Sequence, residues 1–166
     1  MIVDVGIGDM PYEPLPLVIG SYRQGPFLYK VAPSEVEPKG WRLEHDPLGS
    51  SAGADYDFEP VHDLEVFKPN HSFYSLSSES PWINLFLVRH RHAAGSNELR
   101  GCIWSQRDHD GVKKIELYTK SQWLEVLGDV FHEKLLNYSI LERELLWKRV
   151  WQLHEEWKKT KALQGR

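Results

Sequence analysis

Short apolar runs separated by turn residues fill the first two thirds of the chain. Glycine, proline, asparagine, aspartate and serine are frequent between the runs, which is typical of antiparallel strands joined by tight connections. The pattern predicts strands at 2–5, 26–31, 41–45, 54–58, 84–90, 99–105 and 112–117. It also predicts one short helical turn within 60–67.

The connection between the last two predicted strands is the sequence Asp108-His109-Asp110-Gly111. An Asp-Gly pair supplies the positive φ angles that a tight hairpin turn requires. We therefore interpret this segment as a turn and not as a functional site.

The hydrophobic period changes to a helical one from Thr119 onward. Thr119 and Gln122 have the spacing of a capping box, in which each side chain bonds an otherwise unpaired amide of the first turn. Apolar residues then recur at helical spacing, namely Trp123, Leu127, Val130 and Phe131. A helix is therefore predicted to begin here.

A second helix is indicated by the same capping spacing at Ser139 and Glu142. One predicted face carries an apolar stripe, flanked by Trp147 and Trp151, and the other face is charged. The stripe consists of Leu146, Val150, Leu153 and Trp157. The whole pattern predicts a mixed β and α fold, with a partly closed antiparallel β-barrel over 1–118 and a helical region over 119–166.

Composition and charge limit the function classes. The chain has 166 residues, of which 41% are hydrophobic, so it can form one domain or two small ones. Its net charge of −4 indicates no nucleic acid or anionic membrane as partner. A single cysteine, with no targeting segment and no membrane-spanning stretch, favours a reducing, cytoplasmic compartment.

Residues capable of catalysis or metal binding do not form a recognisable set. Cys102 follows a glycine in a predicted strand and is interpreted as a small buried hydrophobe. His90 and His92 share one strand face but have no further ligands at a recognisable spacing, so no metal site is predicted. His62 is interpreted as part of a polar short helix.

A family resemblance rests on several motifs in a shared order. The segment Val3-Asp4-Val5-Gly6-Ile7-Gly8, followed by Pro-Leu-Pro-Leu at 14–17, resembles the strand and glycine turn that hold the triad aspartate of arylamine N-acetyltransferases. Segments at 41–43, 56–58, 63–65, 73–75 and 80–82 follow the family's order and spacing, as does the helix from Thr119. The chain departs from the family at Ile7 and Trp82, where phenylalanine is usual.

The resemblance implies acetyl transfer from acetyl-coenzyme A to an arylamine, a hydrazine or a related amine through a Cys-His-Asp triad. Asp4 would be the aspartate that orients the histidine. The glycine turn, Gly6 and Gly8, would border the coenzyme A cleft, where backbone amides can approach an anion closely. Ser75 and Ser80 would offer hydroxyls to the same cofactor.

The triad cysteine and histidine precede the aspartate in the family, whereas three residues precede Asp4 here. The chain is therefore expected to be a C-terminal portion that is inactive alone. Two alternatives remain open: a noncatalytic remnant that binds coenzyme A or a partner chain, and a relative that closes macrolactam rings. The tryptophan-rich stripe is expected either to fold back within the chain or to form a homodimer.

Overall fold

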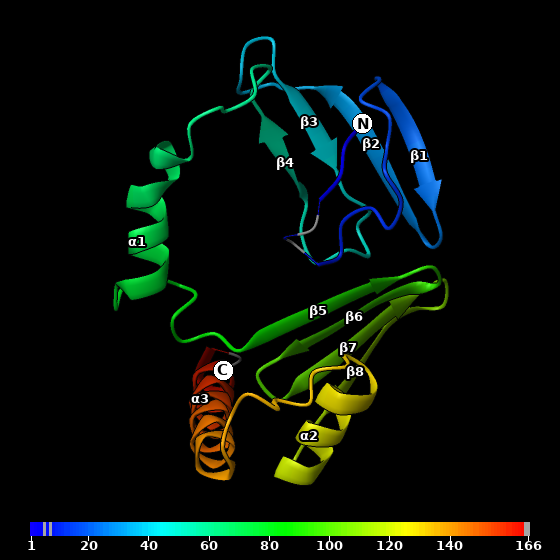
Figure 1. Cartoon of the computed structure of the whole chain (residues 1–166). Helices are drawn as coiled ribbons and strands as arrows, with labels where there is room; N and C mark the ends of the chain where they lie inside the picture. The colour runs from blue at the N-terminus through cyan, green and yellow to red at the C-terminus, as the bar shows by residue number, and fades with distance from the viewer. Residues whose placement is uncertain (5, 7, 165–166) are drawn as a thin grey trace. The chain divides into compact units, whose positions relative to one another are not determined.

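The computed structural model describes residues 1–4, 6 and 8–164, which form two compact units. The first unit comprises 1–69, 89–97 and 106–113, and the second comprises 70–88, 98–105 and 114–166. The elements of both units are shown in Figure 1. Among the described residues, no helix combines the length and the apolar character that crossing a bilayer requires.

The first sheet is a meander of four strands in sequence order: β1 (Gly20–Gln24), β2 (Phe27–Pro33), β3 (Trp41–Glu44) and β4 (Gly53–Tyr56). Each neighbouring pair is antiparallel. Buried and exposed positions alternate along β2, so that Phe27, Tyr29 and Val31 point to one face. That face forms the apolar core of the first unit together with Ile2, Met10, Leu15 and Leu43.

A second sheet contains β5 (Leu87–His92), β6 (Gly95–Arg100), β7 (Ile103–Asp108) and β8 (Gly111–Glu116), also in sequence order. The turn after β7 confirms the predicted hairpin, and its Gly111 has φ 115°. The remaining elements are η1 (Leu64–Phe67), α1 (Lys68–Leu76), α2 (Lys120–Asp129) and α3 (Ile140–Gln164).

Both C-terminal helices begin where the capping boxes predict. In α2, the Thr119 hydroxyl accepts from the Gln122 amide, and the Gln122 side chain accepts from the Thr119 amide at 3.2 Å. In α3, the Ser139 amide donates to Glu142 Oε2 at 2.7 Å, and the Glu142 amide donates to Ser139 Oγ at 3.2 Å. These reciprocal bonds satisfy amides that helix geometry leaves unpaired.

The core of the second unit forms where α2 and α3 bring their apolar faces together with residues of the second sheet. Its buried members are Leu99, Cys102, Leu117, Trp123, Val126, Leu127, Leu135 and Val150. The face of α3 that packs here differs from the predicted stripe. His154 is buried, whereas Leu153 is only half-buried and Trp157 is 48% exposed. The predicted stripe is therefore confirmed at Leu146 and Val150, which belong to this core or pack against it, and is wrong at Leu153 and Trp157.

The mixed β and α fold class is confirmed, but two predicted strands are wrong. At 2–5, Ile2 makes only an isolated bridge to Leu15, and Val5 lies outside the described residues. The segment 99–105 is interrupted by a turn at Gly101, whose φ of 58° ends β6 before β7 begins. Barrel closure and the boundary between 118 and 119 stay predictions.

Candidate functional site

The predicted aspartate lies in a turn of the first unit. Asp4 is half-buried, and its Oδ1 accepts from the Gly6 amide at 3.0 Å. Burial raises the pKa of the Tyr56 phenol, and the negative charge of Asp4 raises it further. The Asp4 carboxylate therefore acts on the end of β4, where the Tyr56 ring stacks on Trp41 with 4.2 Å between centroids.

The backbone angle and the close neighbours of Gly8 explain why this position requires glycine. Its φ is 86°, and a Cβ placed on it would lie 2.6 Å from the Cβ of Arg89 on β5. By contrast, Gly6 has no atom within 4 Å of such a Cβ. The backbone at Gly8 thus approaches β5 more closely than any side chain allows. Ile7 lies outside the described residues.

Asp9 anchors the end of the same turn, and sequence reasoning missed it. The side chain is 1% exposed, and its Oδ2 accepts from the Ser50 amide at 2.7 Å. The Asp9 carbonyl accepts from His45 Nε2 at 2.6 Å and from the Tyr29 hydroxyl at 3.3 Å. Because these partners are distant from Asp9 in sequence, no local motif could have predicted the network.

Ser75 and Ser80 belong to the second unit, whereas Asp4, Gly6 and Gly8 belong to the first. Within α1, the exposed Ser75 hydroxyl donates to the His71 carbonyl at 2.6 Å. Ser80 is 3% exposed, and its hydroxyl donates to the Tyr74 carbonyl at 2.8 Å. Both hydroxyls thus have partners within the chain, and their cofactor role stays a prediction.

Arg91 holds the β1–β2 turn and the β5–β6 turn together within the first unit. Its guanidinium donates to the carbonyls of Gln24 at 2.7 Å, Gly25 at 3.2 Å and Gly95 at 2.8 Å. It also lies over the Phe27 ring, 4.8 Å from the centroid. Carbonyl partners partly compensate the burial of this charge, and through them Arg91 connects the ends of these strands.

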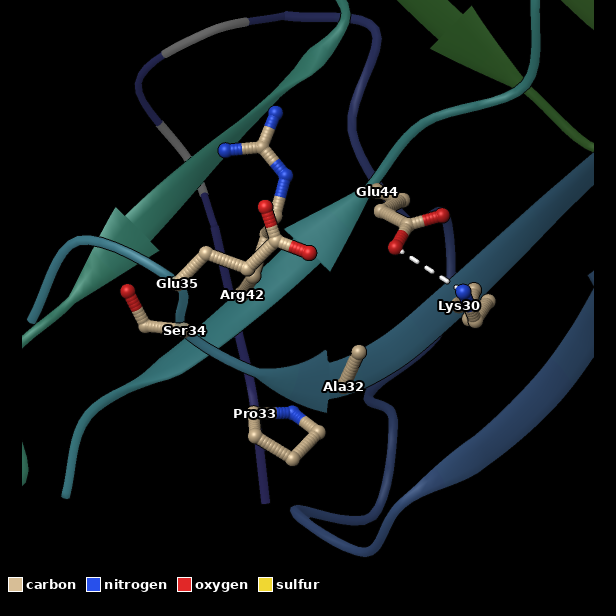
Figure 2. A pocket seen from close by; sticks show the side chains of 7 residues that line it. All are labelled: Lys30, Ala32, Pro33, Ser34, Glu35, Arg42 and Glu44. Atoms are coloured by element: carbon tan, nitrogen blue, oxygen red, sulfur yellow. Dashed lines mark hydrogen bonds and ion pairs between the residues drawn. The ribbon is translucent and has the colours of Figure 1, made fainter. Parts of the chain in front are cut away.

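A hollow of about 430 Å³ opens on the outer face of the first sheet. Figure 2 shows its charged side chains on β2, on β3 and directly after β2. Lys30 pairs with Glu44 at 3.0 Å, and Arg42 pairs with Asp55. Opposite charges therefore compensate one another here, and none of the predicted site residues lines the hollow.

Potential metal ligands and the single cysteine of the described residues lie in or beside turns. Among the described residues, the only group of at least three close ligand atoms is Asp108, His109 and Asp110, in the β7–β8 turn. Burial, with the charges of Glu116 and Glu155, raises the pKa of the Cys102 thiol to about 12. The predicted burial of Cys102 is confirmed, although it lies in a turn and not in a strand. Such a thiol is not an activated nucleophile.

Glu116 is the most strongly perturbed carboxylate of the second unit. Its Oε1 accepts from His154 Nε2 and from Lys158 Nζ, each at 2.9 Å, and its Oε2 accepts from the Tyr118 hydroxyl at 3.0 Å. The bonds from His154 and Lys158 lower the pKa of Glu116 to about 2. The cluster ties α3 to β8.

Because the pKa of Glu116 is lower in the folded chain, this group should stabilise the second unit above about pH 4.5. That stability should fall by about 2 kcal/mol as the pH drops toward 2, when the carboxylate becomes protonated. Urea unfolding followed by circular dichroism between pH 7 and 2 tests this prediction. The difference between the wild type and Glu116→Gln should shrink over that window. A difference that stays constant, as expected for Glu125→Gln on the exposed face of α2, would contradict it.

No family model matches the sequence, and no curated protein sequence matches it significantly. Several solved protein structures, however, are similar to this chain. The arylamine N-acetyltransferase of Mycobacterium marinum in complex with CoA is 24% identical, with a TM-score of 0.71 over 89% of this chain and 54% of that chain. The Mycobacterium abscessus enzyme is 20% identical, with a TM-score of 0.71 over 89% of this chain and 53% of that one.

The arylamine N-acetyltransferase from Salmonella typhimurium is 15% identical, with a TM-score of 0.67 over 89% of this chain and 54% of that chain. The chain therefore has the fold of part of the arylamine N-acetyltransferase structures, as the sequence resemblance implied. It spans about half the length of the structures that it matches.

Proposed function

We propose that this chain is the C-terminal part of an acetyl-coenzyme A-dependent arylamine N-acetyltransferase. The observation that carries the proposal is the structural match over 89% of the chain to such an enzyme in complex with CoA. The order of the sequence motifs that begin at Asp4 supports it independently. We also propose a cytoplasmic location, which the free and buried Cys102 supports.

The proposed reaction has two steps. A cysteine thiolate attacks the thioester carbonyl, the carbon–sulfur bond breaks, and coenzyme A leaves as the thiol after taking up a proton. The amine then attacks the acetyl-cysteine, loses a proton, and releases the thiolate as the amide forms. A histidine carries the protons, and Asp4 orients this histidine and stabilises its charged form. Of these three groups, the family resemblance assigns only Asp4 to a residue of this chain.

The local structure is compatible with this role for Asp4. Its Oδ1 accepts from the Gly6 amide at 3.0 Å, which restrains the orientation of the carboxylate. Gly8 keeps the following backbone in a conformation that other residues rarely adopt. We infer that a carboxylate at this position can orient a histidine supplied by another segment.

The proposal predicts that the isolated chain binds coenzyme A but does not acetylate an arylamine. In isothermal titration calorimetry, Gly8→Ala should weaken coenzyme A binding at least roughly tenfold, because the new Cβ displaces the turn from Arg89. Gly101→Ala is the matched control, since Gly101 also has positive φ but has open space around it. No binding at millimolar coenzyme A, or equal weakening in both variants, would contradict the proposed cleft.

Turnover is the second measurement. Acetyl-coenzyme A and an aromatic amine should give no amide above the level without protein, because a triad acts as a unit. Amide formation by the pure chain that disappears in Cys102→Ser would show that the chain carries a nucleophile of its own, and the assignment of Asp4 to a shared triad would be wrong.

A further inference from the structure

α3 has two faces with different surroundings. The inner face packs in the second unit, where Trp147, Val150, Trp151 and His154 follow one another at helical spacing. The opposite face is centred on Gln152 and is exposed. Leu141 and Leu163, near the two ends of this outer face, are 67% and 73% exposed.

Residues that complement each other lie at equal distances before and after Gln152 on the outer face. Leu141 and Leu163 lie eleven positions before and after Gln152, while Lys148 and Glu156 lie four positions before and after it. In an α-helix these spacings place all five side chains within one stripe, because 3.6 residues complete a turn. We call these five residues the outer stripe.

We propose that two copies of the chain associate through the outer stripes of their α3 helices, packed antiparallel about a twofold axis at Gln152. In that arrangement each Leu141 meets the Leu163 of the other copy, and each Lys148 meets the Glu156 of the other copy. A twofold interface requires a surface that complements itself, and the outer stripe meets this requirement in both apolar and charged positions.

Charge complementarity favours a second copy over any other occupant. The two Lys148–Glu156 pairs form only when the helices are antiparallel and in this register; a shift by one turn removes them. Within each copy, Gln152 Nε2 donates to Glu156 Oε1 at 2.9 Å, which holds that carboxylate on the stripe. Glu144, the acidic neighbour of Lys148 along the helix, is already bonded by Lys120.

The remaining exposed positions along the stripe are compatible with this packing. Leu145 is 56% exposed and lies seven positions before Gln152, while the exposed Lys159 lies seven positions after it. The aliphatic part of a lysine side chain can cover a leucine while its ammonium group stays in water. Three leucines from each copy make a small apolar interface, so the dimer should be weak and should dissociate on dilution.

Charge reversal tests the arrangement. Light scattering and sedimentation over a concentration series should show a monomer–dimer equilibrium for the wild type. Lys148→Glu or Glu156→Lys alone should weaken the dimer roughly tenfold, because two attractive pairs become repulsive. The double variant should restore the dimer to within roughly threefold of the wild type, since the pairs re-form with opposite sign. Glu125→Lys on α2 is the control and should have no effect.

A cysteine at the axis gives an independent measurement. The two Gln152 residues should face each other, so Gln152→Cys should form a covalent dimer under mild oxidation, whereas Glu125→Cys should not. The native Cys102 is fully buried and should not interfere. A wild type that stays monomeric at all concentrations, a double variant that is not restored, or equal cross-linking of both cysteine variants would each overturn the proposal.

Discussion

Replacement of Trp123 by alanine is expected to lower the free energy of unfolding of the second unit by about 4 kcal/mol. The side chain is fully buried, and its ring lies 4.8 Å from that of Phe86 and 5.8 Å from that of Trp147. Its indole N–H also donates to the Gly101 carbonyl at 3.1 Å. Alanine removes the ring contacts and leaves a cavity between α2 and α3.

Urea unfolding followed by circular dichroism at 222 nm measures this loss, because α2 and α3 belong to the second unit. Trp123→Phe separates the contribution of ring packing from that of the hydrogen bond to Gly101, since phenylalanine retains most of the ring volume but has no N–H group. It should cost only about 1–2 kcal/mol. Equal losses in the two variants would show that the hydrogen bond, and not the packing, makes Trp123 important.

The second large effect is expected at Gly53, where β4 begins. A Cβ at this position would lie 2.0 Å from the carbonyl oxygen of Leu43 on the paired strand β3, and the φ angle is 116°. Gly53→Ala should therefore separate two hydrogen-bonded strands and strain the backbone. We expect a loss of at least about 4 kcal/mol from the stability of the first unit.

Gly111 provides a closely matched control for Gly53. It lies in the same unit with φ 115°, and no atom lies within 4 Å of a Cβ placed there. Gly111→Ala therefore carries only the backbone strain, about 2 kcal/mol. The difference between the two variants in urea unfolding measures the contact with Leu43. Equal destabilisation would mean that the first sheet relaxes without cost around the added methyl group.

Local signals in the sequence predicted local structure well. The capping residues Thr119 and Ser139 mark the starts of α2 and α3, because the bonds involved join residues only three positions apart. The turn before Gly111 follows from the same kind of short-range chemistry. The strand predicted at 99–105 failed because an apolar run does not reveal that Gly101 has a positive φ and divides it.

The sequence pattern did not predict the elements that depend on long-range packing. β1 was missed because Gly20–Gln24 is largely polar, and it becomes a strand by pairing with β2. α1 was missed because none of its residues is buried, so no apolar period marks it. The stripe predicted for α3 was wrong at its C-terminal end, because the bond between His154 and Glu116 allows this polar residue to be buried between Trp151 and Trp157.

Residues of the candidate site and its surroundings likewise include some that a local motif predicts and one that it does not. Asp4, Gly6 and Gly8 were predicted from a contiguous motif, and their role in a site stays a prediction; in the structure the Gly6 amide donates to Asp4 Oδ1. Asp9, which fixes the end of that turn, was not found. Its partners Tyr29, His45 and Ser50 come from distant segments, and only the folded chain brings them together.

The aromatic residues that pack along α3 also give the two units different optical properties. Every tryptophan except Trp41 belongs to the second unit, and the rings of Trp123, Trp147 and Trp151 follow one another at 5.8 and 5.4 Å. Indole emission will therefore report almost entirely on the second unit. The single stacked Trp41–Tyr56 pair reports on the first unit. If the units unfold separately, Trp41→Phe will leave the fluorescence transition nearly unchanged, and the difference between fluorescence and circular dichroism curves will reveal the first unit.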